Sequence, residues 1–464
     1  MFGREVYEGR RKELANKVKS GIILILGNSE VGMNYPNNTY RFRQDSSFLY
    51  FFGIDQPDMA GVIDTATGDE VIFGNDVSID DIIWMGPQPA MSERAARVGV
   101  RKVLPYDRLE SYVGEVAAKG AKVHYLPPYR DDNKIRIHKM LGTGIDKVRE
   151  GASAELIKAV VSLRELKDKN EVEEMDKAAD IGYMMHYTAM KMAKAGMVEQ
   201  ELAGIMEGIS ISHGAMPSFP IILSQNGETL HNHSHHQVLT DGRLLVIDAG
   251  AETNLHYASD FTRTLPAGGK FTQVQKDIYT IVSTANNLAI DMIRPGITYR
   301  EVHLSAAKVL AQGLINLGLM KGNAAEAVEA GAHALFMPHG LGHQMGLDVH
   351  DMEDLGENFV GYSDTFTRAT QFGLKSLRMG KELKAGHVIT VEPGCYFIPA
   401  LIEKWKKEGI NSQFINFDAL KEFYTFGGIR LEDDVLVTAN GCRLLGAKRL
   451  PITVDDVERE MAGN

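Results

Sequence analysis

Two aspartates on a predicted β-hairpin, Asp248 and Asp260, are the first residues in this sequence whose types and spacing suggest chemistry. The apolar run 244–247 precedes Asp248, and a second short strand predicted at residues 255–258 ends at Asp260. A turn through residues 252–254 would bring the two carboxylates close together. Buried carboxylates repel one another, and a bound cation removes that cost. Two solvent-exposed acids at a turn fit this stretch alone equally well, so the C-terminal third must decide.

A histidine-containing segment, residues 337–351 (MPHGLGHQMGLDVHD), adds nitrogen ligands. Its histidines are His339, His343 and His350, and its glycines allow the backbone to approach a site closely. These glycines disfavour a long helix, so the helical His-Glu-x-x-His zinc pattern is not expected here.

Two further predicted strands each present carboxylates. Residues 388–394 (VITVEPG) form an apolar strand that ends on Glu392, and residues 428–437 (GIRLEDDVLV) form another. On the second strand a period of two places three polar residues on one face: Arg430, Glu432 and Asp434. Three apolar strands that all deliver carboxylates to one domain are difficult to explain as isolated salt bridges.

Together the segments offer four carboxylates and one imidazole: Asp248, Asp260, His343, Glu392 and Glu432. Oxygen-rich sets favour Mn²⁺ or Mg²⁺ over zinc. Four anions exceed what one divalent ion needs, which indicates two ions about 3.5–4 Å apart with shared carboxylates. Such a pair can hold a bridging hydroxide, clamp a carbonyl oxygen and stabilise a tetrahedral intermediate, so the predicted chemistry is metal-assisted hydrolysis.

The C-terminal part, residues 166–464, is predicted as one α+β domain. A charged segment, residues 164–174, marks its start, and Asp168 with Glu171 forms a capping-box pattern for a helix that reaches Ala195. Further helices are predicted at 198–212, 272–293 and 298–317, and strands at 221–224, 244–247, 388–391 and 429–437. Long helices interleaved with antiparallel-type strands suggest helices that cover one sheet face.

The N-terminal part, residues 1–165, alternates helix and strand patterns and is predicted as an α/β domain without obvious chemistry. Helices are expected at 6–18, 106–118 and 155–166, strands at 21–27 and 122–126, and a hairpin at 60–73. Trp84 is interpreted as a packed core or interface aromatic in preference to a substrate contact.

Bulk properties restrict the partners and the compartment. The 464 residues are 44% hydrophobic and 24% charged, which fits a two-domain globular protein. The net charge of -11 argues against nucleic-acid and anionic-membrane partners. Two cysteines cannot form a disulfide framework, and the charged N-terminus does not resemble a secretory signal. We therefore expect a cytoplasmic protein.

The motifs, taken in order, resemble a known family. The Asp248/Asp260 hairpin, HGLGHQMGLDVHD, VEPG and GIRLEDD resemble the dinuclear metallopeptidases with the pita-bread fold, which include methionine aminopeptidase, aminopeptidase P and prolidase. Residues 41–64 (RFRQDSSFLYFFGIDQPDMAGVID) and IIWMG resemble the N-terminal domain of the proline-specific members. Residues 373–398 and the following FGGIRLEDDVLVT are most similar to prolidases.

The resemblance implies a ligand set for two divalent ions, with Mn²⁺ expected. Asp248 would bind one metal, and Asp260 and Glu432 would bridge the pair. His343 and Glu392 would complete the second metal's ligands.

The resemblance also implies catalytic and substrate-binding roles. Glu392 would shuttle a proton, His231 would stabilise the intermediate or hold the substrate, and Arg430 would support the bridging glutamate. His339 and His350 would contact the substrate and the scissile carbonyl. Arg378 would bind the free carboxylate of the substrate, a role that suits the planar guanidinium fork.

The implied function is hydrolysis of the Xaa-Pro bond, with prolidase action on Xaa-Pro dipeptides preferred and aminopeptidase P action on longer peptides as the alternative. A homodimer is implied as well. A non-catalytic pita-bread binding protein and a metal-free hydrolase of the creatinase type are further alternatives. The five filled ligand positions argue against both, because so many carboxylates would repel one another without metal.

The sequence departs from the family pattern in two places. The interval between Asp248 and Asp260 is one residue longer than is usual, so the hairpin turn or a bulge must absorb the extra residue. His231 begins an unusual histidine run, in which we interpret His233, His235 and His236 as solvated. Cys395 is expected to pack in the core, and Cys442 has no evident role.

Overall fold

The computed structural model describes residues 1–214 and 216–462, which divide into two compact units. The first unit holds Met1–Arg164 and Met352–Phe359, and the second holds Glu165–Asp351 and the chain from Val360 onward. The predicted boundary between residues 165 and 166 lies beside this division, but the return of Met352–Phe359 to the first unit has no counterpart in the prediction. The last two residues of the predicted 166–464 domain lie outside the described residues.

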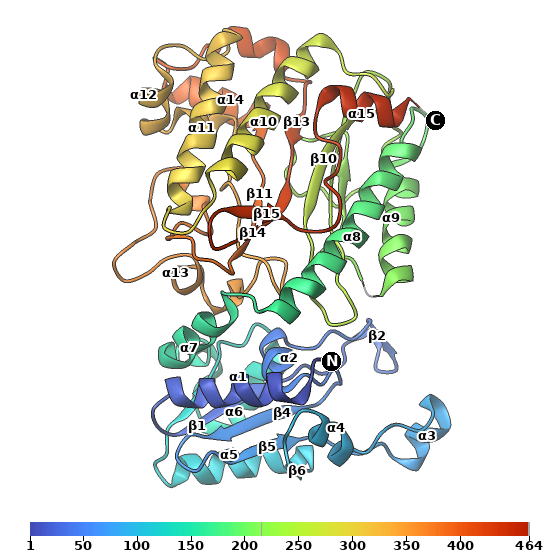
Figure 1. Cartoon of the computed structure of the whole chain (residues 1–464), viewed down its shortest axis with the longest axis vertical. Coiled ribbons are helices and arrows are strands. Elements are labelled where there is room, and N and C mark those ends of the chain that lie inside the picture. The colour runs from blue at the N-terminus through green and yellow to red at the C-terminus, as the bar shows by residue number, and fades with distance from the viewer. Residues whose placement is uncertain (215, 463–464) are drawn as a thin grey trace. The chain divides into compact units, whose positions relative to one another are not determined.

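The first unit is built on a mixed five-stranded sheet in the order β6-β5-β4-β1-β7 (Figure 1). Its strands are β1 (Ile22–Leu26), β4 (Ala60–Asp64), β5 (Glu70–Phe73), β6 (Lys102–Leu104) and β7 (Val123–Tyr125), and a separate hairpin joins β2 (Gly32–Tyr35) to β3 (Asn38–Thr39). Its helices are α1 (Arg4–Lys17), α2 (Ser46–Phe52), α3 (Ile79–Met85), α4 (Met91–Arg97), α5 (Leu109–Ala118), α6 (Asp131–Leu141) and α7 (Ala154–Arg164). The predicted hairpin at 60–73 is confirmed as the antiparallel pair of β4 and β5.

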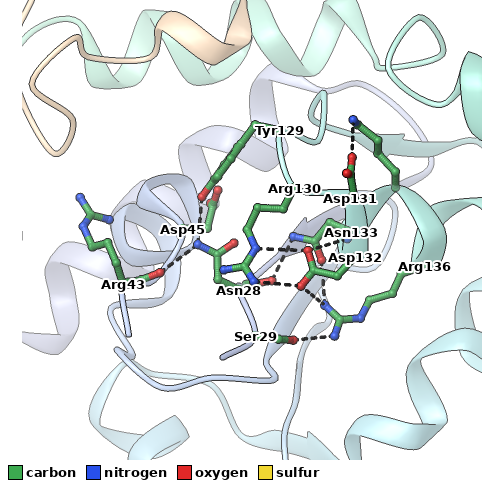
Figure 2. Close-up of polar contacts among 12 residues, drawn as sticks. Asn28, Ser29, Arg43, Asp45, Tyr129, Arg130, Asp131, Asp132, Asn133 and Arg136 are labelled. Atoms are coloured by element: carbon green, nitrogen blue, oxygen red, sulfur yellow. Dashed lines mark hydrogen bonds and ion pairs between the residues drawn. The ribbon is translucent and has the colours of Figure 1, made fainter. Parts of the chain in front are cut away.

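A polar network joins the loop after β1 to the start of α6 (Figure 2). The Asn28 side-chain amide donates to the Tyr129 hydroxyl at 2.9 Å, and Arg136 Nη2 donates to Ser29 Oγ at 2.6 Å. Arg130 is paired with Asp132 at 3.2 Å. These polar side chains find their partners within the network. The network therefore has a structural role, which is to hold the loop after β1 against the start of α6.

Helix α3 is almost entirely exposed. Trp84 is 86% exposed, so the core alternative of its interpretation is wrong, whereas the interface alternative stays a prediction. Ile79 and Ile83 beside it are 77% and 70% exposed. The helix is nevertheless well formed, because Ser78 and Asp81 make a capping box at its N-terminus.

The second unit surrounds short strands with long helices. Its strands are β8 (Ile222–Ser224), β9 (Leu244–Ala249), β10 (Phe261–Pro266), β11 (Val388–Val391), β12 (Gly394–Tyr396), β13 (Gly428–Arg430), β14 (Asp433–Val437) and β15 (Cys442–Leu444). Its helices are α8 (Lys169–Met192), α9 (Glu199–His213), α10 (Gln273–Met292), α11 (Tyr299–Asn316), α12 (Ala324–Glu329), α14 (Pro399–Glu408) and α15 (Val454–Met461), while α13 (Glu357–Val360) lies where the chain re-enters this unit. Helix α8 packs against β9 and β10, and α10 packs against β11 and β13 (Figure 1).

The predicted helix starts of this unit are confirmed. Asp168 with Glu171, Thr272 with Gln275 and Thr298 with Glu301 each form a reciprocal capping box. Among the described helices, none combines the length and apolar character needed to cross a bilayer.

Two strand predictions are wrong in detail. The strand that returns from the Asp248 turn is β10, which begins at Phe261 after Asp260, and not residues 255–258. Residues 255–258 form the tip of the hairpin instead: Glu252 and Ala258 make one antiparallel bridge, and the Thr253 N–H donates to the Tyr257 carbonyl. His256 in this connection has a left-handed φ of 66°, so the tip between the two aspartates is irregular.

The predicted strand 429–437 is interrupted after Arg430. β13 pairs with β12, whereas β14 pairs with β11. Between them the Leu431 N–H donates to Pro393 and the Glu432 N–H donates to Thr262. The chain thus changes its pairing partner within two residues, which a period-two pattern cannot reveal.

A buried ion-pair network fastens β14 to β10. Arg263 is fully buried, and its Nη2 lies 2.6 Å from the Asp433 carboxylate. The same carboxylate binds Arg449 at 2.7 Å. Burial acts to raise the pKa of Asp433, but the two arginines outweigh it and hold this pKa below its usual value. Asp433 and Arg263 therefore form a buried ion pair that holds β14 against β10.

Replacing Asp433 by Asn should destabilise the protein strongly, because Arg263 would remain buried without its anion. We expect a loss of about 3–5 kcal/mol in the free energy of unfolding, measured by chemical denaturation. The matched control is Asp418→Asn, since Asp418 pairs with Lys421 on the surface, and it should leave the unfolding midpoint unchanged. Equal effects of the two substitutions would contradict this assignment.

Candidate functional site

The β9–β10 hairpin places both aspartates on one face. In the antiparallel register Asp248 is opposite Thr262. Asp260 precedes Thr262 by two residues and therefore points to the same side. Both carboxylates are buried. The alternative of solvent-exposed acids at a turn is thereby excluded.

Glu432 and His343 reach the same face from other segments. Thr262 forms a bridge with Glu432, and its hydroxyl donates to Glu432 Oε2 at 2.6 Å. His343 Nε2 lies 3.5 Å from Asp260 Oδ2 and 3.9 Å from Glu392 Oε1. One ligand atom from each of Asp260, His343 and Glu432 lies within 4.8 Å of the others.

The predicted need for glycine near His343 has a steric cause. A Cβ on Gly342 would lie 2.1 Å from the Thr390 carbonyl oxygen of β11. Only glycine lets the His343 loop approach β11 closely enough for the His343 N–H to be bound by Thr390 Oγ1 at 3.1 Å.

All ten predicted site residues line one cavity of about 680 Å³ within the second unit. They are His231, Asp248, Asp260, His339, His343, His350, Arg378, Glu392, Arg430 and Glu432. The apolar part of the wall includes Phe219, Pro220 and Val349. The cavity therefore combines carboxylates, imidazoles and guanidinium groups with an apolar surface, as in a small-ligand site.

The carboxylates are crowded and incompletely satisfied. Burial and then neighbouring carboxylates raise the pKa values of Asp260 and Glu432 well above normal. Burial likewise raises the pKa of Glu392, to about 8. Asp248 Oδ1 and Asp260 Oδ1 are buried without a hydrogen-bond partner. Oxygen atoms held together in this way fit divalent cations, which would neutralise the anions and occupy the unsatisfied oxygens.

The cavity histidines are kept neutral. Burial, followed by the nearby Arg430, lowers the pKa of His339 to about 4. Burial and Arg378 lower the pKa of His350 to about 4, and burial also lowers that of His231. Neutral imidazoles can bind metal or donate a hydrogen bond at neutral pH.

Tyr396 is a site residue that the sequence reasoning missed. Arg430 Nη2 donates to Asp248 Oδ2 at 2.6 Å, and Arg430 Nη1 donates to the Tyr396 hydroxyl at 2.8 Å. That hydroxyl lies 3.0 Å from His339 Nε2. The available signal was its position four residues after Glu392, on a strand that pairs with the Arg430 strand.

The histidine run is only partly solvated, contrary to prediction. His233 is exposed but borders the cavity beside His231, and His236 is exposed. His235 is half-buried, with Nδ1 3.0 Å from the Leu223 carbonyl oxygen. Cys395 is fully buried, as expected for a packing residue.

Comparison with known proteins identifies both parts of the chain. Residues 173–439 match the model of metallopeptidase family M24, and residues 7–125 match that of the aminopeptidase P N-terminal domain. An Xaa-Pro dipeptidase of Homo sapiens is 32% identical over 455 residues, covering 96% of this chain and 90% of that protein. A probable Xaa-Pro aminopeptidase of Aspergillus fumigatus is 33% identical over 430 residues, covering 90% and 87%.

Solved structures agree over the whole length. The Pseudomonas aeruginosa aminopeptidase PepP superposes with a TM-score of 0.81 at 28% identity, covering 100% of this chain and 98% of that one. The predicted architecture, an α/β N-terminal domain followed by a pita-bread α+β domain, is thereby confirmed. The chain belongs to metallopeptidase family M24, within the group of prolidases and aminopeptidases P.

Proposed function

We propose that this metallopeptidase hydrolyses the bond between an N-terminal residue and proline, and that Xaa-Pro dipeptides are its preferred substrates. The observation that carries the proposal is one cavity containing both the carboxylate and histidine cluster and Arg378. The Homo sapiens relative is named a dipeptidase and the Aspergillus fumigatus relative an aminopeptidase. The preference for dipeptides over longer peptides therefore depends on Arg378.

The proposal assigns two divalent ions to the carboxylate cluster, with Mn²⁺ as the expected metal because oxygen ligands predominate. The five residues that would hold the ions are Asp248, Asp260, His343, Glu392 and Glu432. When bound, such a pair supplies Lewis-acid activation of water and of the scissile carbonyl.

Glu392 is proposed to move the proton. It follows directly after β11, so its backbone is fixed by the Glu392 N–H bond to the Leu341 carbonyl at 2.8 Å. Its carboxylate lies between His343 and His339, the latter 3.8 Å away. In this position it can accept a proton from the attacking water and pass it to the departing proline nitrogen.

The neutral histidines are proposed to hold the substrate and the developing oxyanion. His231 and His350 can donate to a carbonyl oxygen without adding a positive charge beside the metals. Both ring nitrogens of His339 already have partners, Gly340 O at 2.7 Å and the Tyr396 hydroxyl. A contact between His339 and the substrate must therefore replace one of these bonds. Arg430 stabilises the cluster by holding Asp248.

Arg378 is proposed to bind the substrate carboxylate. The side chain is half-buried in the cavity wall, and burial lowers the pKa of its guanidinium. A cation in this setting gains from pairing with an anion, and a dipeptide carries its carboxylate close to the scissile bond. A longer peptide has no carboxylate at that position.

Replacing Arg378 by Ala should reduce kcat/KM for an Xaa-Pro dipeptide by roughly 10–100-fold, the range expected for one lost charge-assisted pair. An Xaa-Pro-Xaa tripeptide should be much less affected. Lys375→Ala is the matched control, since it removes an exposed cation three residues away. Equal losses on the two substrates would contradict the dipeptidase preference and favour aminopeptidase activity.

Removal of metal by a chelator should abolish activity and lower the melting temperature, and added Mn²⁺ should restore both. A ligand at 100 times its Kd stabilises the folded state by about 2.7 kcal/mol, so the shift is measurable by calorimetry. Asp260→Ala should show little Mn²⁺-dependent shift. Undiminished activity after complete chelation would rule out the metal mechanism.

We also propose a homodimer that acts in the cytoplasm. Four large apolar side chains of α3 are at least 64% exposed: Ile79, Ile83, Trp84 and Met85. Several highly exposed apolar side chains on one short helix are typical of a protein interface. Both cysteines are free thiols, which is usual in a reducing compartment.

The double substitution Ile83→Ser and Trp84→Ser should convert the dimer to a monomer, because it removes two of the four highly exposed apolar side chains of α3. Light scattering after size-exclusion chromatography measures the mass directly. Ile211→Ser on α9 changes another exposed apolar residue, 48% exposed, and should leave the mass unchanged. A wild-type monomer, or a dimer that survives the α3 substitutions, would refute this interface.

A further inference from the structure

A fully buried glutamate outside the cavity, Glu199, holds both ends of the segment that carries His231. Glu199 is the first residue of α9. Its Oε1 accepts the Gln225 N–H at 2.8 Å, and its Oε2 accepts the Gln237 N–H at 3.4 Å. One carboxylate therefore joins two points twelve residues apart, and His231 lies between them.

Backbone hydrogen bonds also join the start of α9 to the end of this segment. The Glu199 N–H donates to the Gln237 carbonyl and the Gln200 N–H donates to the His235 carbonyl, each at 2.9 Å. Val198 forms an antiparallel bridge with Val238. The start of α9 and the end of the segment thus form a short two-stranded contact that Glu199 completes from its side chain.

Polar side chains fasten the interior of the segment to β8. The Asn232 amide donates to Ser224 Oγ at 2.9 Å, and His235 Nδ1 lies 3.0 Å from the Leu223 carbonyl oxygen. In contrast, the side chains of His231 and His233 border the cavity. Asn232 and His235, which bond to β8, alternate along the chain with His231 and His233, which border the cavity. The placement of His231 therefore depends on the bonds to β8.

A buried carboxylate needs compensation, and here it comes from backbone N–H groups. Among the ion pairs of residues 1–214 and 216–462, none includes Glu199. Because both oxygens accept from N–H groups, the bonding pattern is that of the ionised carboxylate. A glutamine of the same shape would direct an NH₂ group at one of the two donors and lose that bond. The site therefore specifically requires a carboxylate.

We propose that Glu199 is a positioning residue for His231: it fixes segment 225–237 so that the imidazole faces the carboxylate cluster. This inference rests on the proposed function, because Glu199 reaches the reaction only through His231. It touches none of the five proposed metal ligands, so metal binding should not depend on it.

The test is a double-mutant cycle of Glu199→Gln and His231→Ala, assayed on an Xaa-Pro dipeptide with Mn²⁺. Glu199→Gln alone should lower kcat by roughly 10-fold, the effect of one lost charge-assisted hydrogen bond, with KM changed less. In the His231→Ala background the same substitution should change kcat less than about twofold. Equal effects in both backgrounds, or no effect in the wild-type background, would overturn the proposal.

Two further measurements separate positioning from general damage. The Mn²⁺-dependent melting shift should be unchanged by Glu199→Gln, and hydrogen exchange should accelerate within residues 225–237 only. Glu458→Gln is the matched control, since this buried carboxylate accepts the Phe271 N–H at 3.0 Å away from the cavity. If Glu199→Gln does not fold, Gln237→Pro removes one of the two donors instead.

The two proposals can fail separately. A wild-type protein that does not cleave Xaa-Pro substrates would refute the proposed function, and the exchange result alone would then decide whether Glu199 holds the segment. Unchanged exchange across residues 225–237 would overturn the role of Glu199 whatever the activity.

Discussion

The mutual repulsion of four crowded carboxylates is the constraint on which the second unit depends. Asp248, Asp260 and Glu432 are buried, Glu392 is partly buried, and all four converge in one cavity. Such a cluster is costly in the free protein, and its raised pKa values express that cost. A protein that retains such a carboxylate cluster is suited to bind cations. In the absence of cations, a neutral or apolar site would give a more stable protein.

The surrounding residues act against this repulsion by fixing each carboxylate from outside. Thr262 donates to Glu432, Arg430 donates to Asp248, and Asp434 accepts the backbone N–H of Asp260. Behind them the Arg263–Asp433 pair fastens β10 to β14. The proposed ligands are thus held in place by the protein itself, which would reduce the ordering that metal binding must supply.

The segment that carries His231, residues 225–237, is also held in place by groups outside the cavity. Its cavity side chains are presented from a loop, which is the part of a fold that is least fixed by a regular ladder. A buried carboxylate and several side-chain bonds replace the missing ladder. The accurate placement of the cavity side chains on this loop therefore depends on polar groups that do not line the cavity.

Part of the site was predictable from sequence because two of the proposed ligands, Asp248 and Glu392, come at the end of apolar strand runs. The runs before Asp248 and Glu392 and the alternation of Arg430, Glu432 and Asp434 are local patterns, and local patterns survive in the structure even where β13 and β14 separate. The helix starts were predictable for the same reason, since a capping box is complete within four residues.

Other features could not be predicted, because their partners are distant in the chain. Tyr396 joins the site through Arg430, which lies 34 residues away, and Glu199 binds Gln237 across 38 residues. The N–H groups of Ala258 and Asp260 likewise bond to Gly346 and Asp434, which are distant in the chain. Trp84 was interpreted as a core or interface aromatic, and its sequence neighbours do not indicate which of the two it is, because that depends on which elements fold over α3.

The sequence by itself determined which side chains are candidates for the chemistry, since residue type and spacing indicate possible ligands, caps and strand ends. Only the tertiary structure decided how those side chains are held. The hydrogen bonds that orient them join segments that approach one another only after the chain has folded.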